Sequence, residues 1–351
     1  MGNRDMLGSS FLFILFFIFN LAFLEAQVAQ VPPAMFVFGD SLVDVGNNNY
    51  LSLSVQKATF PHNGIDFLTK KPTGRFSNGK NTADFIAEKF GLPTSPPYLS
   101  LTSKVKNKEK VLFMDGVNFA SGGAGILGGM CDLKGQSISL RKQVDYYSQV
   151  HQQMMQQIGA PTLEKHLSKS IFLVVIGSND IFGYFNSKDL QHKSTPQQYA
   201  DSMAASLRVH LQRVYNFGAR IFVIAGVGAL GCCPAIRLRN VESVQETNLL
   251  AVRYNDVLKK MLKEWHLQNK GVSYTYLDTY STIQDMLQNP TSYGFTELKA
   301  ACCGLGNLNA QVPCLPCSNV CSNRQDHIFW DLYHPTEAAA RIFVDKSFHG
   351  L

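Results

Sequence analysis

Short apolar runs of strand length alternate with longer helical patterns along most of this chain of 351 residues. The runs lie at about 34–39, 171–176, 220–227 and 272–278, with a shorter one near 115–120. Elsewhere apolar residues recur at three- and four-residue intervals, which predicts helices over 81–90, 139–157, 197–217, 241–266 and 335–347. Alternating β and α units favour an α/β fold with a mostly parallel central sheet and helices on both faces.

The N-terminal segment is typical of a secretory signal peptide, which we predict over residues 1–26. Arg4 precedes an apolar run from Phe11 to Leu24, and Ala26 and Ala29 are small residues of the kind found at cleavage sites. A membrane-spanning helix needs about 20 apolar residues, so this run is too short for a stable transmembrane anchor. We therefore expect the chain to enter the secretory pathway and lose this segment.

The remainder, residues 27–351, is predicted to be a single domain. Hydrophobic residues make up 45% of the chain, enough for a large core, and 17% charged residues is too few for a disordered protein. The net charge of +6 is accompanied by no nucleic-acid-binding motif, so we expect no nucleic-acid partner. The sequence does not indicate an oligomeric state.

A serine directly follows the first apolar run, where Phe36-Val37-Phe38 ends in Gly39-Asp40-Ser41. A turn after a strand holds a side chain at the carboxyl edge of the sheet, where open α/β sheets bind ligands. Ser41 is therefore a candidate nucleophile, which would need a base and an oxyanion site elsewhere. The alternative is ordinary turn chemistry, because Asp and Ser side chains bond their own backbone.

An acid and an imidazole stand three positions apart near the other end, as Asp331 and His334. On a helical turn this spacing places both on one face, so Asp331 can orient His334 while the other ring nitrogen accepts a proton from Ser41. The alternative is a plain helix start, since Pro335 suits the first turn and Glu337 suits the positive end of the helix dipole.

Two more polar segments follow apolar runs, at 118–125 (Asn-Phe-Ala-Ser-Gly-Gly-Ala-Gly) and at 177–180 (Gly-Ser-Asn-Asp). The second also fits a strand-to-helix cap with Asn179 or Asp180 as N-cap. The glycines at 123–128 and 226–231 fit the spacing G-x-G-x-x-G, but neither stretch opens a helix, as a dinucleotide site requires. No Gly-x-Ser-x-Gly occurs, which excludes the nucleophile elbow of α/β-hydrolases.

These four segments, in this order, resemble the signature blocks of the GDSL esterase/lipase family, also called SGNH hydrolases, and particularly its land-plant branch. Stretches 61–67 and 72–79 are similar to that branch as well. The resemblance implies a flavodoxin-like three-layer α/β/α fold. It also implies a catalytic triad of Ser41, Asp331 and His334, an oxyanion hole of the Ser41 backbone N–H, Gly123 and Asn179, and neither metal nor cofactor. The residue types suit these roles, because an amide donates without titrating and glycine lets its N–H approach closely.

Eight cysteines lie beyond the predicted signal, and in an oxidising compartment we expect them to form disulfides. They are Cys131, Cys232, Cys233, Cys302, Cys303, Cys314, Cys317 and Cys321. Cys314 and Cys317 have a spacing that also occurs in zinc sites, and the sequence cannot choose the pairing. Five cysteines fall between 302 and 321, which predicts a stapled, otherwise irregular loop that holds the Asp331–His334 turn in place.

The sequence thus predicts a secreted serine esterase or lipase that cleaves carboxylic esters through an acyl-enzyme. Its partner would be a small-molecule or lipid ester; acylated plant metabolites, wall esters, cutin monomers and glycerolipids all remain open. The expected destination is the cell wall or apoplast, with the vacuole or another endomembrane compartment as the alternative. An acyltransferase with the same triad and a non-catalytic wall-binding or lipid-binding protein on this fold are the rival functions.

Overall fold

Four parallel strands form the central sheet of the computed structural model, which describes residues 31–106, 113–128 and 136–348. They are β1 (Met35–Gly39), β2 (Ile171–Val175), β3 (Ile221–Ala225) and β4 (Ser273–Leu277), adjacent in that order. Each lies within a predicted run. The chain divides into two compact units, Met1–Pro32 and Pro33–Leu351, and the sheet belongs to the second. The predicted signal peptide lies outside the described residues.

The predicted run near 115–120 is a short partner of β1 rather than a full strand. The Val37 N–H donates to the Val117 carbonyl (2.9 Å), and the Phe119 N–H donates to the Val37 carbonyl (2.8 Å). This segment pairs in parallel with β1 through a single bridge between Val37 and Asn118. Counted with it, the strand order is that of a flavodoxin-like sheet.

Helices occupy most of the connections between strands. Their bounds are α2 (Thr82–Lys89), α3 (Tyr98–Lys106), α4 (Leu140–Ile158), α5 (Ala160–Leu167), α6 (Ser178–Asn186), α7 (Lys188–Lys193), α8 (Pro196–Asn216), α9 (Pro234–Arg237), α10 (Val241–Gln268), α11 (Thr279–Gln288) and α12 (Glu337–Phe348). In the described part of the chain, no helix combines the length and apolarity that crossing a membrane requires.

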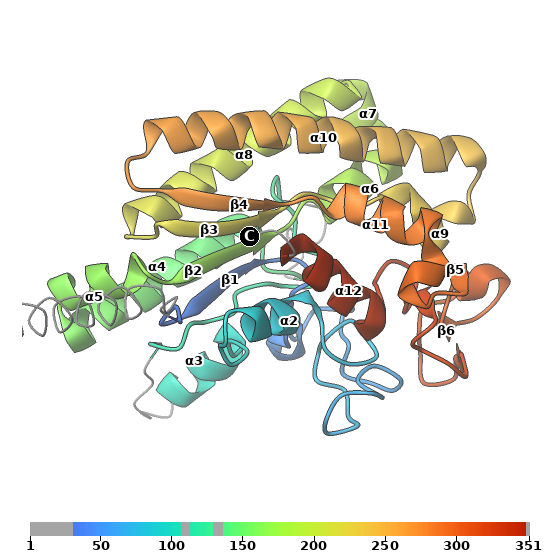
Figure 1. The fold of residues 1–351 in the computed structure, drawn as a ribbon, viewed down its shortest axis with the longest axis horizontal. Coiled ribbons are helices and arrows are strands. Elements are labelled where there is room, and N and C mark those ends of the chain that lie inside the picture. Colours follow the sequence, from blue (N-terminus) through green and yellow to red (C-terminus); the bar gives the residue numbers. More distant parts are fainter. Residues whose placement is uncertain (1–30, 107–112, 129–135, 349–351) are drawn as a thin grey trace, which may run out of the picture. The chain divides into compact units, whose positions relative to one another are not determined.

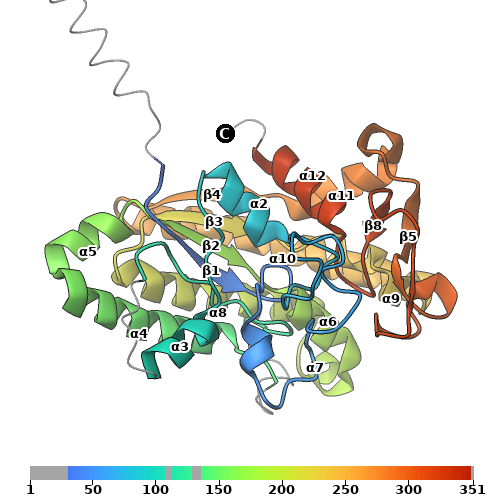
Figure 2. The ribbon, with the colours of Figure 1, turned by 90° about the horizontal axis from the view of Figure 1, so that it is seen from below.

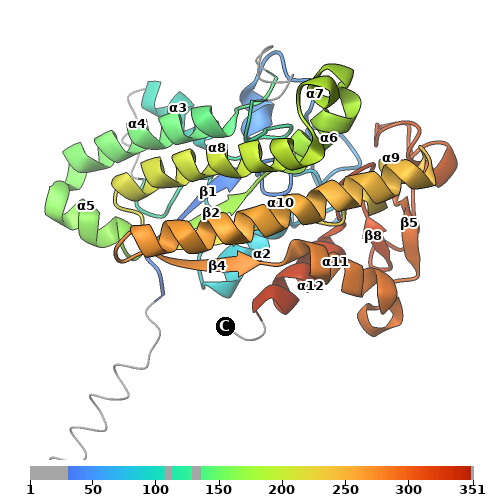
Figure 3. The same ribbon diagram turned by 90° about the horizontal axis from the view of Figure 1, so that it is seen from above.

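Two apolar clusters, one on each face of the sheet, give the unit its three layers. Phe36 and Phe38 of β1 pack into the cluster that contains buried residues of α4, α8 and α10. Met35 and Val37 point to the opposite face and pack with residues of α2, α11 and α12. Figures 1 and 3 show α8 and α10 over one face, and Figure 2 shows α2 and α12 near the other. Strands β1, β2 and β3 are thus buried on both sides, as is typical of parallel sheets, while the edge strand β4 is only partly buried.

The strand register brings three loops to one edge of the sheet. Gly39 at the end of β1 pairs with Val175 at the end of β2, which pairs with Ala225 at the end of β3. The segments after these residues therefore start side by side at the carboxyl edge. Ser41 follows the first and Asn179 follows the second.

The C-terminal helix begins later than predicted. We expected it to start at Pro335, but α12 starts at Glu337. The Thr336 hydroxyl accepts from the Ala339 N–H (3.1 Å) and donates to the His327 carbonyl (2.7 Å), so it caps the helix and ties it to the preceding strand. Residues 331–335 are left free of the helix to form a turn.

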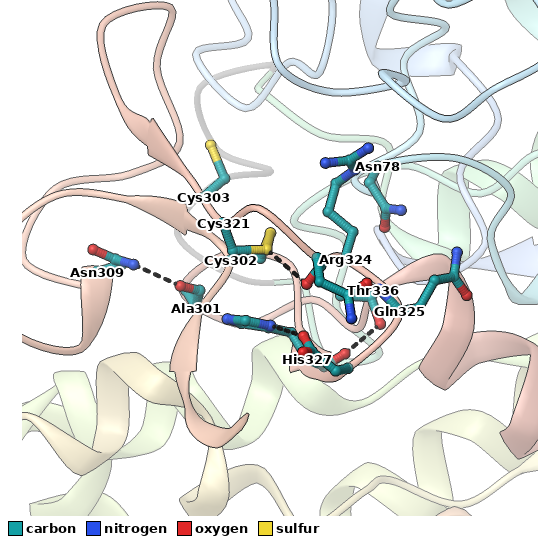
Figure 4. Close-up of a disulfide and its surroundings, with 12 residues drawn as sticks. Asn78, Ala301, Cys302, Cys303, Asn309, Cys321, Arg324, Gln325, His327 and Thr336 are labelled. Atoms are coloured by element: carbon teal, nitrogen blue, oxygen red, sulfur yellow. Dashed lines mark hydrogen bonds and ion pairs between the residues drawn. A yellow bond between two sulfur atoms is a disulfide. The ribbon is translucent and has the colours of Figure 1, made fainter. Parts of the chain in front are cut away.

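The cysteine-rich segment between α11 and α12 is stapled as predicted, but it is not irregular throughout. Disulfides join Cys302 to Cys321 (Figure 4) and Cys303 to Cys314. Cys314 is therefore not a zinc ligand. The segment contains four short strands, β5 (Glu297–Ala301), β6 (Cys303–Gly304), β7 (Asn319–Val320) and β8 (His327–Phe329). The expectation that all the cysteines form disulfides is wrong, since Cys232, Cys233 and Cys317 are free thiols; Cys131 lies outside the described residues.

Candidate active site

Ser41 lies in a turn that its neighbours fix to the end of β1. The Asp40 N–H donates to the Val175 carbonyl (3.1 Å), and the Leu42 N–H donates to the Asp40 carboxylate (3.0 Å). A Cβ atom on Gly39 would lie 2.4 Å from the Val175 carbonyl oxygen, so the close pairing of β1 with β2 requires glycine here. The serine side chain is consequently held at the carboxyl edge of the sheet.

His334 connects Ser41 to Asp331 in a continuous hydrogen-bonded chain. Its Nε2 lies 2.7 Å from the Ser41 Oγ, across 293 positions of sequence, and its Nδ1 lies 2.8 Å from each Asp331 carboxylate oxygen. A neutral imidazole with its proton on Nδ1 donates to the carboxylate and leaves Nε2 as an acceptor. The ring can therefore take the proton of Ser41. The structure brings these three predicted residues together.

The Asp331–His334 pair sits in a turn and not on a helical face, which corrects the geometry that we expected. The Asp331 Oδ1 accepts from the backbone N–H groups of Tyr333 (3.0 Å) and His334 (2.9 Å). One carboxylate thus folds the turn and orients the imidazole. The plain helix start proposed as the alternative is wrong as well, because α12 begins only at Glu337.

Charges around His334 favour its protonated form. Burial by itself lowers the pKa of His334, but the charge of Asp331 and the hydrogen bond to it outweigh burial and raise that pKa above 6.5. Burial raises the pKa of Asp331, yet His334 and the two backbone N–H groups lower it overall. Burial raises the pKa of Asp40 to about 7. The site therefore holds an ionised acid beside a strengthened base.

Asn179 and the loop around Gly123 also come together. Asn179 lies in the first turn of α6, and its Nδ2 donates to the Ala124 carbonyl (3.0 Å). Neither Asn179 nor Asp180 is the N-cap of this helix, which is Gly177. The Asp180 carboxylate instead accepts from the Ile126 N–H (2.9 Å). An amide carries two hydrogens, so the second one of Asn179 can serve a ligand.

Gly123 takes a backbone conformation that favours glycine, with φ +82°, and a Cβ there would lie 1.9 Å from the Gln56 Oε1. The neighbouring Gly122 N–H donates to the Asp44 carboxylate (3.0 Å), which anchors the loop. Among hydrogen bonds between described residues, none uses the backbone N–H of Ser41 or of Gly123. Both are candidate donors to an oxyanion.

Sequence reasoning missed two side chains that support the site. Gln143 of α4 donates to the Gly39 carbonyl (2.8 Å) and accepts from the Gly39 N–H (2.9 Å), so it fixes the strand end before Ser41. A glutamine between Leu140 and Val144 on the apolar face of the predicted helix was the available signal. The ring of Phe76 stacks on His334, with centroids 5.0 Å apart; the sequence pointed only to its motif, not to this contact.

An apolar cavity of about 80 Å³ adjoins the site. Its lining includes Leu42, which follows Ser41, and Tyr333 and Pro335, which flank His334. Met286 of α11 and Phe343 of α12 also line it. The arrangement offers a nucleophile, a base and neutral hydrogen-bond donors next to room for a small apolar group.

Comparison with known proteins shows the family of this chain. Residues 35–347 match the family model described as GDSL-like Lipase/Acylhydrolase. One GDSL esterase/lipase of Arabidopsis thaliana is 51% identical over 92% of this chain and 88% of its own length. Another from the same plant is 39% identical over 91% of this chain and 87% of its own length. The chain therefore belongs to the GDSL lipase/acylhydrolase family, whose members are carboxylic ester hydrolases.

Proposed function

We propose that this protein hydrolyses carboxylic esters through an acyl-enzyme formed on Ser41. The continuous Ser41–His334–Asp331 chain is the observation that supports this most. The Ser41 Oγ attacks the ester carbonyl carbon while its proton passes to the His334 Nε2, and Asp331 stabilises the resulting imidazolium. His334 then gives the proton to the leaving alcohol. Water, activated by the same imidazole, releases the acid and restores Ser41.

The negative charge that forms on the carbonyl oxygen needs donors that are already in place. The backbone N–H groups of Ser41 and Gly123 and the Asn179 amide are proposed for this role. Support comes from the hydrogen bond that joins Asn179 to the Gly123 loop and from the absence of a protein acceptor for either N–H among the described residues.

A short acyl group suits the cavity best. Its volume of about 80 Å³ is roughly half that of an engineered cavity that binds benzene, so it accommodates only a few carbon atoms. We propose esters of short acyl chains as the preferred class.

We also propose that the protein is secreted. Two observations support this: the N-terminal segment of the sequence, and the two disulfides, because disulfides persist in oxidising compartments.

The test is hydrolysis of p-nitrophenyl esters from acetate to palmitate by wild type, Ser41→Ala and Ser202→Ala. Ser202 is exposed on α8, so its loss controls for serine replacement as such. We expect turnover of the short esters by wild type and Ser202→Ala, and loss of turnover in Ser41→Ala. Equal activity of wild type and Ser41→Ala would refute the nucleophile. Ester formation with an added alcohol but no hydrolysis would identify an acyltransferase, and neither activity would favour a binding protein.

A further inference from the structure

The ring of Phe76 lies against one face of the His334 imidazole, the proposed base. The ring centroids of Phe76 and His334 are 5.0 Å apart and the ring planes differ by 29°, so the two rings are stacked. Asp331 and Ser41 hold the edge of the imidazole by its two nitrogens. Phe76 thus contacts the imidazole perpendicular to its plane, a direction that the two in-plane hydrogen bonds do not restrain.

The same ring lies against the loop that carries Gly123, one of the three proposed oxyanion donors. A Cβ on Gly122 would lie 2.6 Å from both the Cε2 and the Cζ of Phe76, so the phenyl ring occupies the space beside this glycine. Phe76 therefore contacts both the imidazole of His334 and the loop at Gly122.

Buried polar contacts fix the backbone on both sides of Phe76. The Arg75 guanidinium pairs with the Asp84 carboxylate of α2 through two hydrogen bonds of 2.7 and 2.8 Å. The Asn78 side chain accepts from the Glu337 N–H at the start of α12 (2.8 Å). A bidentate, buried pair holds a geometry more strictly than a single contact. The segment 75–78 is consequently anchored to both helices that flank the site.

We propose that Phe76 is a positioning residue of the Ser41–His334 site, whose aromatic face holds the imidazole in line with Ser41 and stabilises the imidazolium formed when the serine proton moves. This inference rests on the proposed function. The negative face of an aromatic ring attracts a cation, and proton transfer places positive charge on His334. The contact is therefore stronger after transfer than before it, as a contribution to catalysis requires.

Phe76→Leu tests this, because leucine keeps apolar bulk over His334 but removes the aromatic face. Phe67→Leu is the matched control: Phe67 lies in the same loop and contacts a cation, Arg75, at 4.8 Å. Among the described residues it is Phe76, and not Phe67, that stacks on His334. We expect kcat of Phe76→Leu to fall roughly three- to tenfold, with KM and Tm close to those of the control. The acid limb of its pH profile should move to lower pH, since the protonated imidazole loses stabilisation.

Two carboxylates also act on His334, Asp331 from its own turn and Asp40 from the turn after β1. Neither is altered by the two variants, so a shift of the acid limb reports on the ring. If Phe76→Leu has a lowered Tm, 3,5-difluorophenylalanine at position 76 replaces it, because fluorination weakens the negative face while nearly keeping the shape. Wild-type kcat and an unmoved acid limb in the folded variant would overturn the inference. If wild type lacks Ser41-dependent hydrolysis, the proposed function itself fails.

Discussion

The protonation state of His334 sets the pH range in which Ser41 can react. Its pKa is raised above 6.5 by Asp331 despite burial, and only the neutral imidazole accepts a proton. We therefore expect kcat/KM to fall as pH drops through a value above 6.5. The sequence alone does not give the direction of this pKa shift, because it shows neither the burial of His334 nor its distance from Asp331.

Asp331→Asn should show how much Asp331 contributes to activity by orienting His334 and by its negative charge. We expect kcat to fall roughly 10³- to 10⁴-fold, as in other triads, and the residual acid limb to move to lower pH because the raising charge is gone. The pH dependence of kcat/KM measures both effects. Asp326→Asn is the control, since Asp326 pairs with His327 at 2.6 Å in the same segment but does not belong to the Ser41 chain. Similar losses in the two variants would contradict the assignment.

Asn179→Ala should slow the chemical step with little effect on the fold. Loss of one oxyanion donor typically costs roughly 10²- to 10³-fold in kcat, and we expect that range with KM changed much less. Steady-state kinetics on a short p-nitrophenyl ester measure it. Asn186→Ala, at the exposed end of the same helix, is the control. A variant at position 179 that keeps wild-type kcat would remove Asn179 from the oxyanion site.

At the scale of elements, a strong apolar period was sufficient to predict a helix where the local pattern and the packing agree. The prediction of 139–157 matches α4 (Leu140–Ile158), and that of 241–266 matches α10 (Val241–Gln268). The four residues of α9 are too few to show a period, and for α6 the sequence indicated only the cap that precedes it. The disulfide pairing, the turn of Asp331 and the Phe76–His334 stack depend on contacts between distant segments, which one sequence does not encode legibly.

The disulfide segment supports the Asp331 turn through backbone contacts. The Cys302 N–H donates to the Phe329 carbonyl (2.9 Å), and the Cys303 N–H donates to the Trp330 carbonyl (2.7 Å), directly before Asp331. A bridge between residues 19 positions apart stabilises the folded segment by about 3 kcal/mol in the chain-entropy account. The disulfide-bonded cysteines therefore hold the backbone of Phe329 and Trp330, the two residues that precede the Asp331 turn.

Replacing Cys302 and Cys321 together by serine should lower both stability and activity. We expect a loss of about 3 kcal/mol in the free energy of unfolding of this segment and a fall in kcat, because the Asp331 turn loses its support. Denaturant unfolding and ester hydrolysis measure the two effects. Cys317→Ser, which removes an exposed free thiol from the same segment, should match wild type. Full activity of the double variant would show that the turn stands without this bridge.

At the scale of the whole molecule, the site joins opposite ends of the chain. The position of the Ser41 hydroxyl is set by the ends of β1 and β2, whereas the position of His334 is set by the segment before α12. The segment before α12 is also linked to the loop before α2, since the Trp330 Nε1–H donates to the Asn63 Oδ1 (3.0 Å) and the Arg324 guanidinium pairs with the Asp66 carboxylate. Residues Pro33–Leu351 form one compact unit. Activity should therefore report on its integrity as a whole.

The two tryptophans of the chain allow a direct test of this coupling. Trp265 is fully buried in the cluster under α10, and Trp330 is fully buried beside the disulfides and Asp331. Trp330→Phe leaves the first reporter and Trp265→Phe leaves the second. We expect the fluorescence transitions of both variants to coincide with their own losses of ester hydrolysis in a denaturant titration, as all-or-none unfolding requires. The alternative outcome is that Trp330 fluorescence and activity are lost together, at a lower denaturant concentration than Trp265 fluorescence. The C-terminal segment would then unfold as a separate unit, and His334 would separate from Ser41 while the sheet is still folded.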